Sequence, residues 1–393
     1  MKIAILTCGM LPIPAVQGGA VENLIDFYLE YNNQKKLHDI TIYSPWDNKV
    51  KNHPALSSDV NHYIYINEKS LKTRIARRIY KCFHSKEYYN HFIEYYFEKV
   101  YSNLKKKDLD IIILENCPGY AYKLSQRGFN NLILHLHNDL LHSSSRYHDE
   151  IFNSLTKILT VSDFIKQRVS SIQPKPNNKI QTIYNGIDVN MFSPKEKLSV
   201  SRKMLGFSES DFIIVYSGRI NNEKGISELI DALLNLKDYP QIKLMVLGSS
   251  FFDNTKYENE FISSLKNKTK EIENKIVFTG YISYNQVPDY LQLADIAVLP
   301  SMWEEPFGLT IVEAMSIGLP LITTRSGGIP EICEGIAIIV DRKDISNNLT
   351  AAILDLYNNP EKRKQMAAAG SKRAKLFDKE IFTKNFFASI EDL

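Results

Sequence analysis

The sequence predicts an α/β protein with two parallel sheets, on three observations. Thirteen short runs are almost continuously apolar and rich in β-branched residues, which is typical of buried parallel strands. Segments with apolar residues three and four positions apart, such as 226–236 and 344–356, lie between runs and indicate amphipathic helices. Thirteen strands are too many for one comfortable open sheet, and 393 residues suit two domains.

The expected strands fall into two groups, separated by a polar stretch at 191–199 that contains Pro194. In the first group they span 2–7, 39–44, 62–66, 110–114, 132–137, 157–161 and 180–184. In the second group they span 212–217, 242–247, 275–278, 296–300, 319–323 and 335–340. We therefore expect Rossmann-like domains at 1–192 and 193–375. The segment 376–393 is helical in pattern and rich in Phe, and we expect it to pack back on the first domain.

Composition excludes several classes of protein. Charged residues make up 24% and apolar residues 44%, as in soluble globular proteins. The net charge of +3 is too small for a dedicated nucleic-acid binder. The four cysteines lack Cys-x-x-Cys spacing, which favours reduced thiols in a cytosolic protein, and no 18-residue apolar run predicts a membrane span.

The charge is unevenly spread along the chain. Residues 1–190 hold 24 Lys and Arg against 18 Asp and Glu, whereas residues 191–393 hold 24 against 27. Much of the excess lies from Lys69 to Lys107, a stretch of helical pattern. Its first part sets apolar residues at four-residue steps among cations: Leu71, Ile75, Ile79 and Phe83 with Arg74, Arg77, Arg78 and Lys81. Such a basic amphipathic helix is typical of a membrane surface, although an ordinary helix with a solvated basic face fits equally.

Two loops have the residues to bind phosphate. The loop after the first strand ends in Gly18-Gly19 before an expected helix, where free backbone N–H groups favour an anion. It lacks the G-x-G-x-x-G pattern of nicotinamide enzymes, and a mere tight turn is the alternative. After the first strand of the second domain come Gly218-Arg219 and then Lys224-Gly225, cations that suit a diphosphate unless they are ordinary surface residues.

The most specific signal is the string from Ser301 to Ala314, which runs from a strand into a helix. Seven residues separate Glu305 from Glu313, and Gly308-Leu309-Thr310 should lie at the helix N-terminus with N–H groups free for an anion. Carboxylates accept hydrogen bonds well from sugar and ribose hydroxyls. Capping glutamates are the alternative.

A strand end carries two histidines. Strand alternation places His135 and His137 on one face, with His137 at the carboxyl end. A core role is the default for His135. A metal cluster of His135, His137, Asp139 and His142 is conceivable by composition, but alternating strand residues seldom converge on one ion, so we expect no metal.

With these motifs the chain resembles the retaining glycosyltransferases of family 4, which have the GT-B fold of two Rossmann-like domains facing across a cleft. The resemblance spans essentially the whole chain. It rests on Glu305–Glu313 with the Glu-Pro-Phe-Gly-Leu core, Gly218-Arg219 with Lys224-Gly225, Tyr184-Asn185-Gly186-Ile187-Asp188, Val161-Ser162, and the turn Gly327-Gly328-Ile329-Pro330-Glu331.

The resemblance implies a role for each matching residue. Arg219 and Lys224 match cations that bind the donor diphosphate, and Glu305 matches the glutamate on the donor sugar. Glu313 matches the ribose-binding glutamate, and His137 a histidine near the anomeric centre. The implied donor site is completed by Gly18, Gly19, Gly218, Tyr281, Ile282, Phe307, Gly308, Leu309 and Thr310.

The implied function is retaining transfer of a sugar from a nucleotide sugar, with UDP expected on family frequency, to a glycan, a lipid-linked or a cell-surface polymer acceptor. No cofactor and no nucleic acid are expected. The implied location is the cytoplasm, with the basic segment a candidate for the inner membrane face. A GT-B nucleotide-sugar epimerase and a non-catalytic nucleotide-sugar binder are the alternatives. The residues leave the sugar, the acceptor, the linkage and the oligomeric state open.

Overall fold

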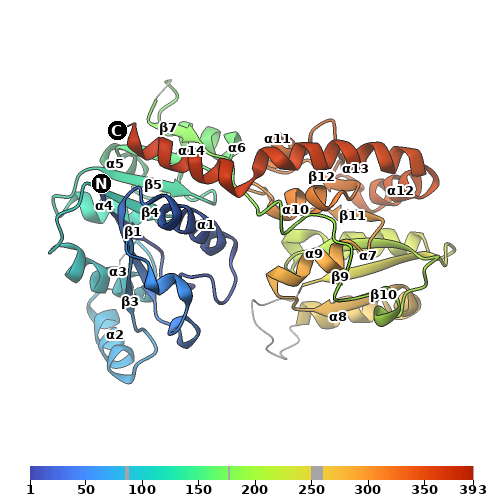
Figure 1. The fold of residues 1–393 in the computed structure, drawn as a ribbon, viewed down its shortest axis with the longest axis horizontal. Helices are drawn as coiled ribbons and strands as arrows, with labels where there is room; N and C mark the ends of the chain where they lie inside the picture. Colours follow the sequence, from blue (N-terminus) through green and yellow to red (C-terminus); the bar gives the residue numbers. More distant parts are fainter. Residues whose placement is uncertain (85–87, 176–177, 249–259, 393) are drawn as a thin grey trace. The chain divides into compact units, whose positions relative to one another are not determined.

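A computed structural model of the chain describes residues 1–84, 88–175, 178–248 and 260–392. These residues form two compact units (Figure 1). Unit 1 comprises Met1–Tyr184 with Phe382–Leu393, and unit 2 comprises Asn185–Ile381. The division falls before the polar stretch at 191–199, so that stretch belongs to unit 2.

The sheet of unit 1 has seven parallel strands among the described residues, in the order β3-β2-β1-β4-β5-β6-β7. Its strands are β1 (Lys2–Leu6), β2 (Asp39–Pro45), β3 (Asn61–Ile66), β4 (Ile111–Glu115), β5 (Leu132–Leu136), β6 (Lys157–Thr160) and β7 (Ile180–Thr182). The order reverses between β1 and β4. Ligands of open parallel sheets bind at such a switch point, beyond the carboxyl ends of the strands.

The sheet of unit 2 repeats this plan, with six parallel strands in the part of the chain described and the order β10-β9-β8-β11-β12-β13. Its strands are β8 (Phe212–Ser217), β9 (Ile242–Leu247), β10 (Ile276–Gly280), β11 (Ile296–Leu299), β12 (Leu321–Thr324) and β13 (Ile338–Val340). The switch point of this sheet lies between β8 and β11. Each strand in both sheets falls on one of the expected apolar runs, which confirms the predicted α/β class with two parallel sheets.

Most helices lie between the strands, and the last three, α12 to α14, follow β13. The helices of the described residues are α1 (Ala20–Lys35), α2 (Leu71–Phe83), α3 (His91–Leu104), α4 (Pro118–Ser125), α5 (His148–Ser154), α6 (Asp163–Ser170), α7 (Ile226–Asn235), α8 (Glu260–Lys268), α9 (Val287–Leu291), α10 (Leu309–Ile317), α11 (Ile329–Cys333), α12 (Ile345–Asn358), α13 (Pro360–Ala374) and α14 (Lys379–Glu391).

The described residues of the basic stretch from Lys69 to Lys107 form two helices, α2 and α3. Helix α2 is capped at its start by the Ser70 side chain, which accepts from the Thr73 N–H. Asn90 caps α3 in the same way, accepting from the N–H groups of Phe92 and Ile93. An N-cap side chain satisfies backbone donors that a continuing helix would already have paired, so it marks a new start.

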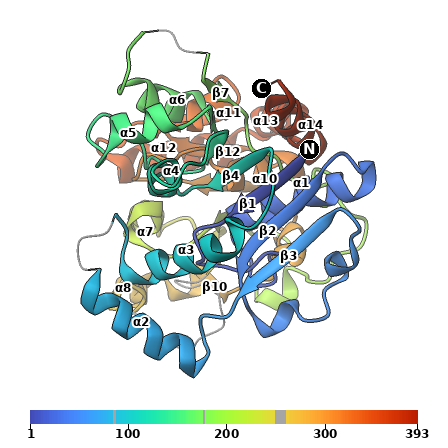
Figure 2. The ribbon, with the colours of Figure 1, turned by 90° about the vertical axis from the view of Figure 1, so that its left-hand side faces the viewer.

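The last helix, α14, packs on unit 1 (Figure 2). The ring of Phe386 stacks on Tyr28 of α1, with centroids 4.3 Å apart and planes 4° from parallel. Lys157 of β6 donates to the carbonyl of Ser389 at 2.5 Å, and His38 pairs with Glu391 at 3.0 Å. Aromatic burial and these polar contacts therefore attach the C-terminus to the first unit.

The two chain segments that cross between the units are hydrogen-bonded to each other. The Ile187 N–H donates to the Phe377 carbonyl at 2.9 Å, and the Lys379 N–H donates to the Ile187 carbonyl at 2.8 Å. Lys379 also forms an ion pair with Asp188 at 2.7 Å. The Asn-Gly-Ile-Asp segment after β7 is thereby tied to the segment before α14.

Candidate active site

Two of the predicted motifs meet at the switch point of unit 2. The Gly218–Gly225 loop follows β8, and the loop with Glu305 follows β11. Because β8 and β11 are neighbouring parallel strands, their carboxyl ends lie at the same edge of the sheet. The topology thus brings together residues that lie about eighty positions apart in the sequence.

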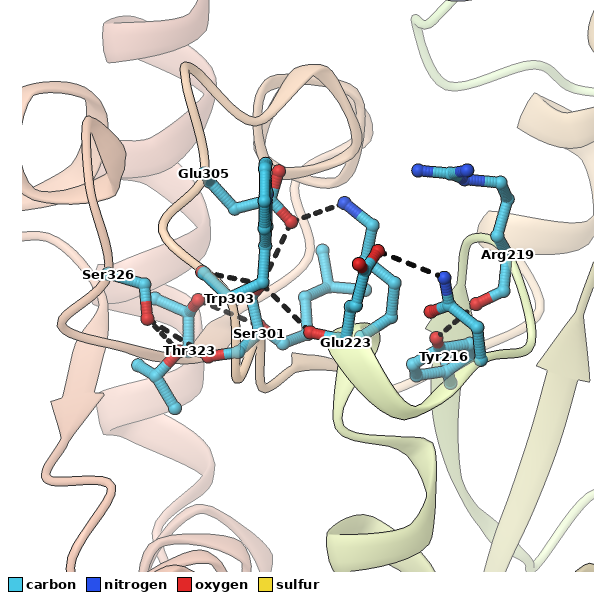
Figure 3. Close-up of polar contacts among 12 residues, drawn as sticks. Tyr216, Arg219, Glu223, Ser301, Trp303, Glu305, Thr323 and Ser326 are labelled. Carbon is cyan, nitrogen blue, oxygen red and sulfur yellow. Dashed lines mark hydrogen bonds and ion pairs between the residues drawn. The ribbon is translucent and has the colours of Figure 1, made fainter. Parts of the chain in front are cut away.

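An ion pair joins the two loops. The Lys224 ammonium donates to the Glu305 carboxylate, and the Ser301 hydroxyl donates to the same carboxylate oxygen at 2.8 Å (Figure 3). The side chains of Lys224 and Glu305 are 23% and 12% exposed, so both still reach solvent. A cation and a carboxylate held this way can contact a charged ligand and its hydroxyls at the same time.

The loop after β8 approaches the loop after β11 too closely for a side chain at Gly225. Gly225 has φ +69°, and a Cβ there would lie 1.8 Å from the Pro300 carbonyl oxygen. The Met302 N–H also donates to the Glu223 carbonyl at 2.8 Å. Glycine is therefore required beside Lys224, and the two loops form one structure.

Arg219 is the second cation of this site. Its carbonyl accepts from the buried Tyr216 hydroxyl at 2.8 Å, which fixes the backbone just beyond β8. Its side chain is exposed and extends on the same side as the Glu305 carboxylate (Figure 3). Two cations at a strand edge supply the bidentate donor and the point charge that a diphosphate requires.

Helix α10 begins beside this cluster and carries Glu313. Its N-cap, Gly308, provides no side-chain hydrogen bond, so the first N–H groups, including those of Leu309 and Thr310, have no side-chain cap. Glu313 is buried, which raises its pKa to about 7, and it accepts from the Tyr284 hydroxyl. A helix N-terminus and a buried carboxylate on one helix suit a phosphate and a hydroxyl-bearing group.

Other predicted donor-site residues occupy different surroundings. Tyr281 and Ile282 follow β10 and are half-buried, and Tyr284, the partner of Glu313, lies in the 3-10 helix Tyr284–Gln286 next to them. The Phe307 ring is buried against Phe377, with centroids 5.6 Å apart. The side chain of Phe307 therefore packs against Phe377 in the interior. Only the backbone of Phe307 could contact a ligand.

Sequence reasoning missed the residues that support the loop after β11. The Glu304 carboxylate accepts from the Gly327 N–H at 2.6 Å and pairs with Arg342. The Glu305 carbonyl accepts from the Gly328 N–H at 2.8 Å. The Gly327–Glu331 turn noted in the sequence thus supports the backbone of Glu305. The sequence analysis named Ser301 only as the first residue of the Ser301–Ala314 string, and nothing in the sequence singled out Arg342.

In unit 1 the Gly18-Gly19 pair lies at the start of α1, where Gly19 is the N-cap and provides no side-chain bond. The loop before it is fixed by its neighbours. The Asp26 carboxylate, whose pKa is raised to about 7 by burial, accepts from the Ala15 N–H at 2.8 Å. Gln17 donates to Asp47 at 2.7 Å. The glycine pair therefore lies on a fixed loop at the start of a helix whose first turn also carries the Glu22 carboxylate, which accepts from the Glu22 N–H.

A buried polar cluster lies at the carboxyl ends of β4 and β5. The Glu115 carboxylate accepts from His137 Nε2 at 2.8 Å, His135 Nδ1 at 3.1 Å and the Tyr28 hydroxyl at 2.9 Å. These donors hold the pKa of Glu115 well below its usual range despite burial. Burial and the neighbouring His135 lower the pKa of His137 to about 4, so its imidazole is neutral at pH 7.

The residues Glu115, His135 and His137 have the chemistry to hold a metal ion, since one ligand atom of each lies within 4.8 Å of the others. Their 2.8 and 3.1 Å contacts are those of a hydrogen-bonded carboxylate. Asp139, which composition grouped with the histidines, pairs instead with Arg168 of α6 at 2.7 Å. Sequence reasoning missed Glu115 because it gives no local signal at the end of an apolar strand.

Unit 1 also contains a cavity of about 430 Å³ beside the β1–α1 loop. Its lining mixes cations, carboxylates and an indole, a combination suited to polar ligands with an apolar face. The residues that line it are Gly9, Met10, Pro12, Gln17, Pro45, Trp46, Asp47, Glu68, Lys69, Arg74 and Arg77.

Comparison with known proteins identifies the class of protein that this fold and these loops define. A family model described as glycosyl transferases group 1 matches residues 199–373, and one described as glycosyltransferase family 4 matches residues 31–191. The chain belongs to the family 4-type glycosyltransferases of GT-B fold, and it is an enzyme of that class.

Individual relatives extend this finding. The chain is 27% identical to the putative glycosyltransferase YtcC of Bacillus subtilis over 92% of this chain and 81% of that protein. It is 26% identical to the lipopolysaccharide 1,2-N-acetylglucosaminetransferase of Salmonella typhimurium over 62% and 64% of the two chains. The crystal structure of Anabaena Alr3699/HepE in complex with UDP has the same fold, with a TM-score of 0.75, 21% identity and full coverage of both chains.

The helices of the described segments are all too short or too polar to cross a bilayer.

Proposed function

We propose that this enzyme is a retaining glycosyltransferase that uses a UDP-sugar and glycosylates a glycan, a lipid-linked or a cell-surface polymer acceptor. The observation that carries the proposal is the ion pair of Lys224 and Glu305, with Arg219 at the same strand edge, at the switch point of unit 2. In the proposal, unit 2 binds the donor and unit 1 the acceptor.

The cations of unit 2 act on the leaving group. As the bond between the anomeric carbon and the diphosphate oxygen lengthens, negative charge grows on the phosphate and positive charge on the sugar. Arg219 and Lys224, with the uncapped N–H groups of α10, would stabilise the growing negative charge. Such preorganised donors lower the barrier because they need no reorientation during the reaction.

The carboxylates have separate roles in the proposal. Glu305 accepts hydrogen bonds from Lys224 and Ser301, which fix the position of its carboxylate and suit it to accept from sugar hydroxyls as well. Glu313 would accept from the ribose hydroxyls. No carboxylate is assigned as a nucleophile. The departing phosphate would itself take the proton of the attacking acceptor hydroxyl, on the face that the phosphate leaves, and this gives retention.

In unit 1, Glu115 and His137 would act through hydrogen bonds. His137 is neutral and donates through Nε2 to Glu115, so it would contact the sugar without adding positive charge near the anomeric carbon. The chemistry assigned to Arg219 and Lys224 is the charge neutralisation that a divalent ion supplies elsewhere, so the proposal needs no metal or cofactor.

The base and the acceptor are the finer parts of the proposal. UDP is supported by the Anabaena protein of the same fold that was solved with UDP. A glycan acceptor at the cell envelope is supported by the Salmonella relative, whose name describes sugar transfer to lipopolysaccharide. We place the enzyme in the cytoplasm, on the inner face of the membrane, because α2 is both basic and apolar on its surface.

A donor panel tests the proposal. Purified enzyme is incubated with UDP-, GDP- and ADP-sugars, nucleotide release is measured, and candidate acceptors are then added to the best donor. Glu305→Ala and Arg219→Ala should keep the fold and lose transfer by at least about 100-fold, as other electrostatic donors do. Glu334→Ala, which removes an exposed carboxylate paired with Arg325, is the matched control. Full activity of both site variants would show that the site is misassigned.

A further inference from the structure

Helix α2 carries four large apolar side chains that are exposed and that no other described residue covers. Leu71 is 72% exposed, Ile75 52%, Ile79 57% and Phe83 79%. They are spaced by four residues and therefore lie along one face of the helix. An amphipathic helix of a soluble protein normally turns this face to the core. The sequence periodicity predicted this apolar face of α2, and in the structure the face is exposed at the surface.

The opposite face of α2 is the one that contacts the protein. Tyr80 packs edge-on against Tyr95 of α3, with centroids 5.7 Å apart, and the Arg77 guanidinium lies 4.1 Å from the Phe92 ring. Both views of the ribbon place α2 at the margin of unit 1, with α3 beside it (Figures 1 and 2). The outward orientation of the apolar face is therefore fixed by packing on α3.

Cations border the apolar face. Lys72, Arg74, Arg78 and Lys81 are all exposed, and the helix sequence LKTRIARRIYKCF contains no acidic residue. An apolar stripe bordered by cations alone is complementary to one kind of surface, in which anionic groups lie over hydrocarbon. A folded protein partner would need an acidic rim around an apolar groove, whereas an anionic bilayer offers both features without a specific fit.

We propose that α2 docks unit 1 on an anionic lipid bilayer. The side chains of Leu71, Ile75, Ile79 and Phe83 enter the boundary between head groups and acyl chains, and Lys72, Arg78 and Lys81 contact lipid phosphates. This membrane binding does not depend on the proposed sugar transfer. Only the inference that it brings the enzyme to a membrane-held acceptor rests on the proposed function.

The same helix connects the bilayer to the cavity of unit 1. Arg74 and Arg77 of α2 line that cavity together with Lys69 and Trp46. A helix that contacts lipid on one face and lines a polar cavity on the other brings the cavity next to the head groups. A membrane-held acceptor with an anionic head group would therefore meet the cavity without leaving the bilayer.

The test is vesicle binding by the full chain. Co-sedimentation is measured with vesicles of phosphatidylcholine mixed with phosphatidylglycerol and with vesicles of phosphatidylcholine alone. We expect binding to the mixed vesicles, at least about tenfold weaker binding to the neutral ones, and a decline with salt. Ile75→Ser with Ile79→Ser, and separately Lys72→Gln with Arg78→Gln and Lys81→Gln, should each weaken binding at least about tenfold.

Matched control variants distinguish binding through α2 from non-specific binding through other exposed cations or apolar side chains. Lys105→Gln with Lys106→Gln and Lys107→Gln removes three exposed cations from another part of unit 1, and Met204→Ser removes an apolar side chain that is 71% exposed on unit 2. Both should leave vesicle binding unchanged. The exposed Cys82 of α2, labelled with an environment-sensitive fluorophore, should show a blue shift when mixed vesicles are added.

Three results would overturn the proposal. One is the absence of binding to the anionic vesicles, and another is binding that both sets of α2 variants leave intact. The third is a concentration-dependent dimer that Ile79→Ser dissolves, because a second copy would then cover the face. Nucleotide release is measured on the same proteins without vesicles. If the wild type released no nucleotide from any donor, the proposed function would be wrong. The result of the vesicle-binding test would not be affected.

Discussion

Glu313 is a carboxylate whose burial disfavours the charge that its proposed role in binding ribose would need. Burial raises its pKa to about 7, and its polar partner in the structure is the Tyr284 hydroxyl. A ribose would add two hydroxyl donors to the ionised form. Nucleoside binding should therefore release the proton and favour ionisation.

We expect nucleoside affinity to depend on pH through Glu313. Uridine, which has no phosphate to titrate in this range, should bind more tightly at pH 8 than at pH 6, because the ionised carboxylate accepts better from hydroxyls. In Glu313→Gln this dependence should disappear. Calorimetric titrations at both pH values check it, and a pH dependence that persists unchanged in the variant would exclude Glu313 as its source.

Glu115 shows the opposite shift, because three donors outweigh its burial. Its pKa lies below the usual value, so it contributes stability that is present above about pH 4.5 and is lost as the pH falls through its lowered pKa. Glu115→Gln should lower the free energy of unfolding by about 1.5–3 kcal/mol at pH 7, because a neutral amide accepts less strongly than the carboxylate from the three buried donors.

The difference between Glu115→Gln and the wild type should shrink below about pH 4.5, because the carboxyl of the unfolded wild type takes up protons there while that of the folded protein stays ionised. Urea unfolding followed at pH 7 and pH 3 measures both values. If the difference in the free energy of unfolding stayed constant with pH, Glu115 would stabilise the fold through its shape and not through its charge.

At the scale of elements, the contact of α14 with α1 attaches the C-terminus to unit 1. Phe386 is fully buried on Tyr28, so Phe386→Ala should lower the free energy of unfolding by about 3–5 kcal/mol. Phe83→Ala makes the same chemical change at a ring that is 79% exposed and should cost less than about 0.5 kcal/mol. Equal effects in chemical denaturation would contradict the packing of α14.

The loop after β8 offers a second test, because two glycines share a backbone conformation and differ in their surroundings. Gly225, with φ +69°, faces the Pro300 carbonyl, whereas Gly206, with φ +81°, has nothing within 4 Å of an added Cβ. Gly206→Ala should cost about 1–2 kcal/mol of backbone strain and keep nucleotide binding.

Gly225→Ala adds the clash to the same strain and displaces Lys224. We expect it to weaken nucleoside diphosphate binding at least about tenfold, measured by calorimetry on the folded variant. Binding equal to that of Gly206→Ala would mean that the loop contact does not position the cation.

At the scale of the whole molecule, the sequence predicted the strands well, and it placed the Gly218–Gly225 and Ser301–Ala314 segments directly after two of them. Buried parallel strands are apolar along their whole length, so the runs at β8 and β11 were visible without any partner. Because the carboxyl ends of parallel strands share an edge, Arg219 and Glu305 could be expected on the same side of a sheet.

Contacts between side chains distant in sequence could not be predicted. The carboxylate of Glu115 accepts from Tyr28 and His137, and Glu304 pairs with Arg342, and neither arrangement has a local pattern. Periodicity showed that α2 has an apolar face but not whether the protein covers it. The division of the basic stretch into α2 and α3 depends on the Asn90 cap, which the apolar spacing does not reveal.

The central claim is that unit 2 binds a nucleoside diphosphate through Arg219 and Lys224. Calorimetric titration of UDP, GDP and ADP into the wild type, Arg219→Ala and Lys224→Ala tests it most directly. One of the three nucleotides should bind the wild type, and each variant should bind it at least about tenfold more weakly while unfolding at a similar temperature. No binding of any of the three, or equal binding by the wild type and both variants, would contradict the claim.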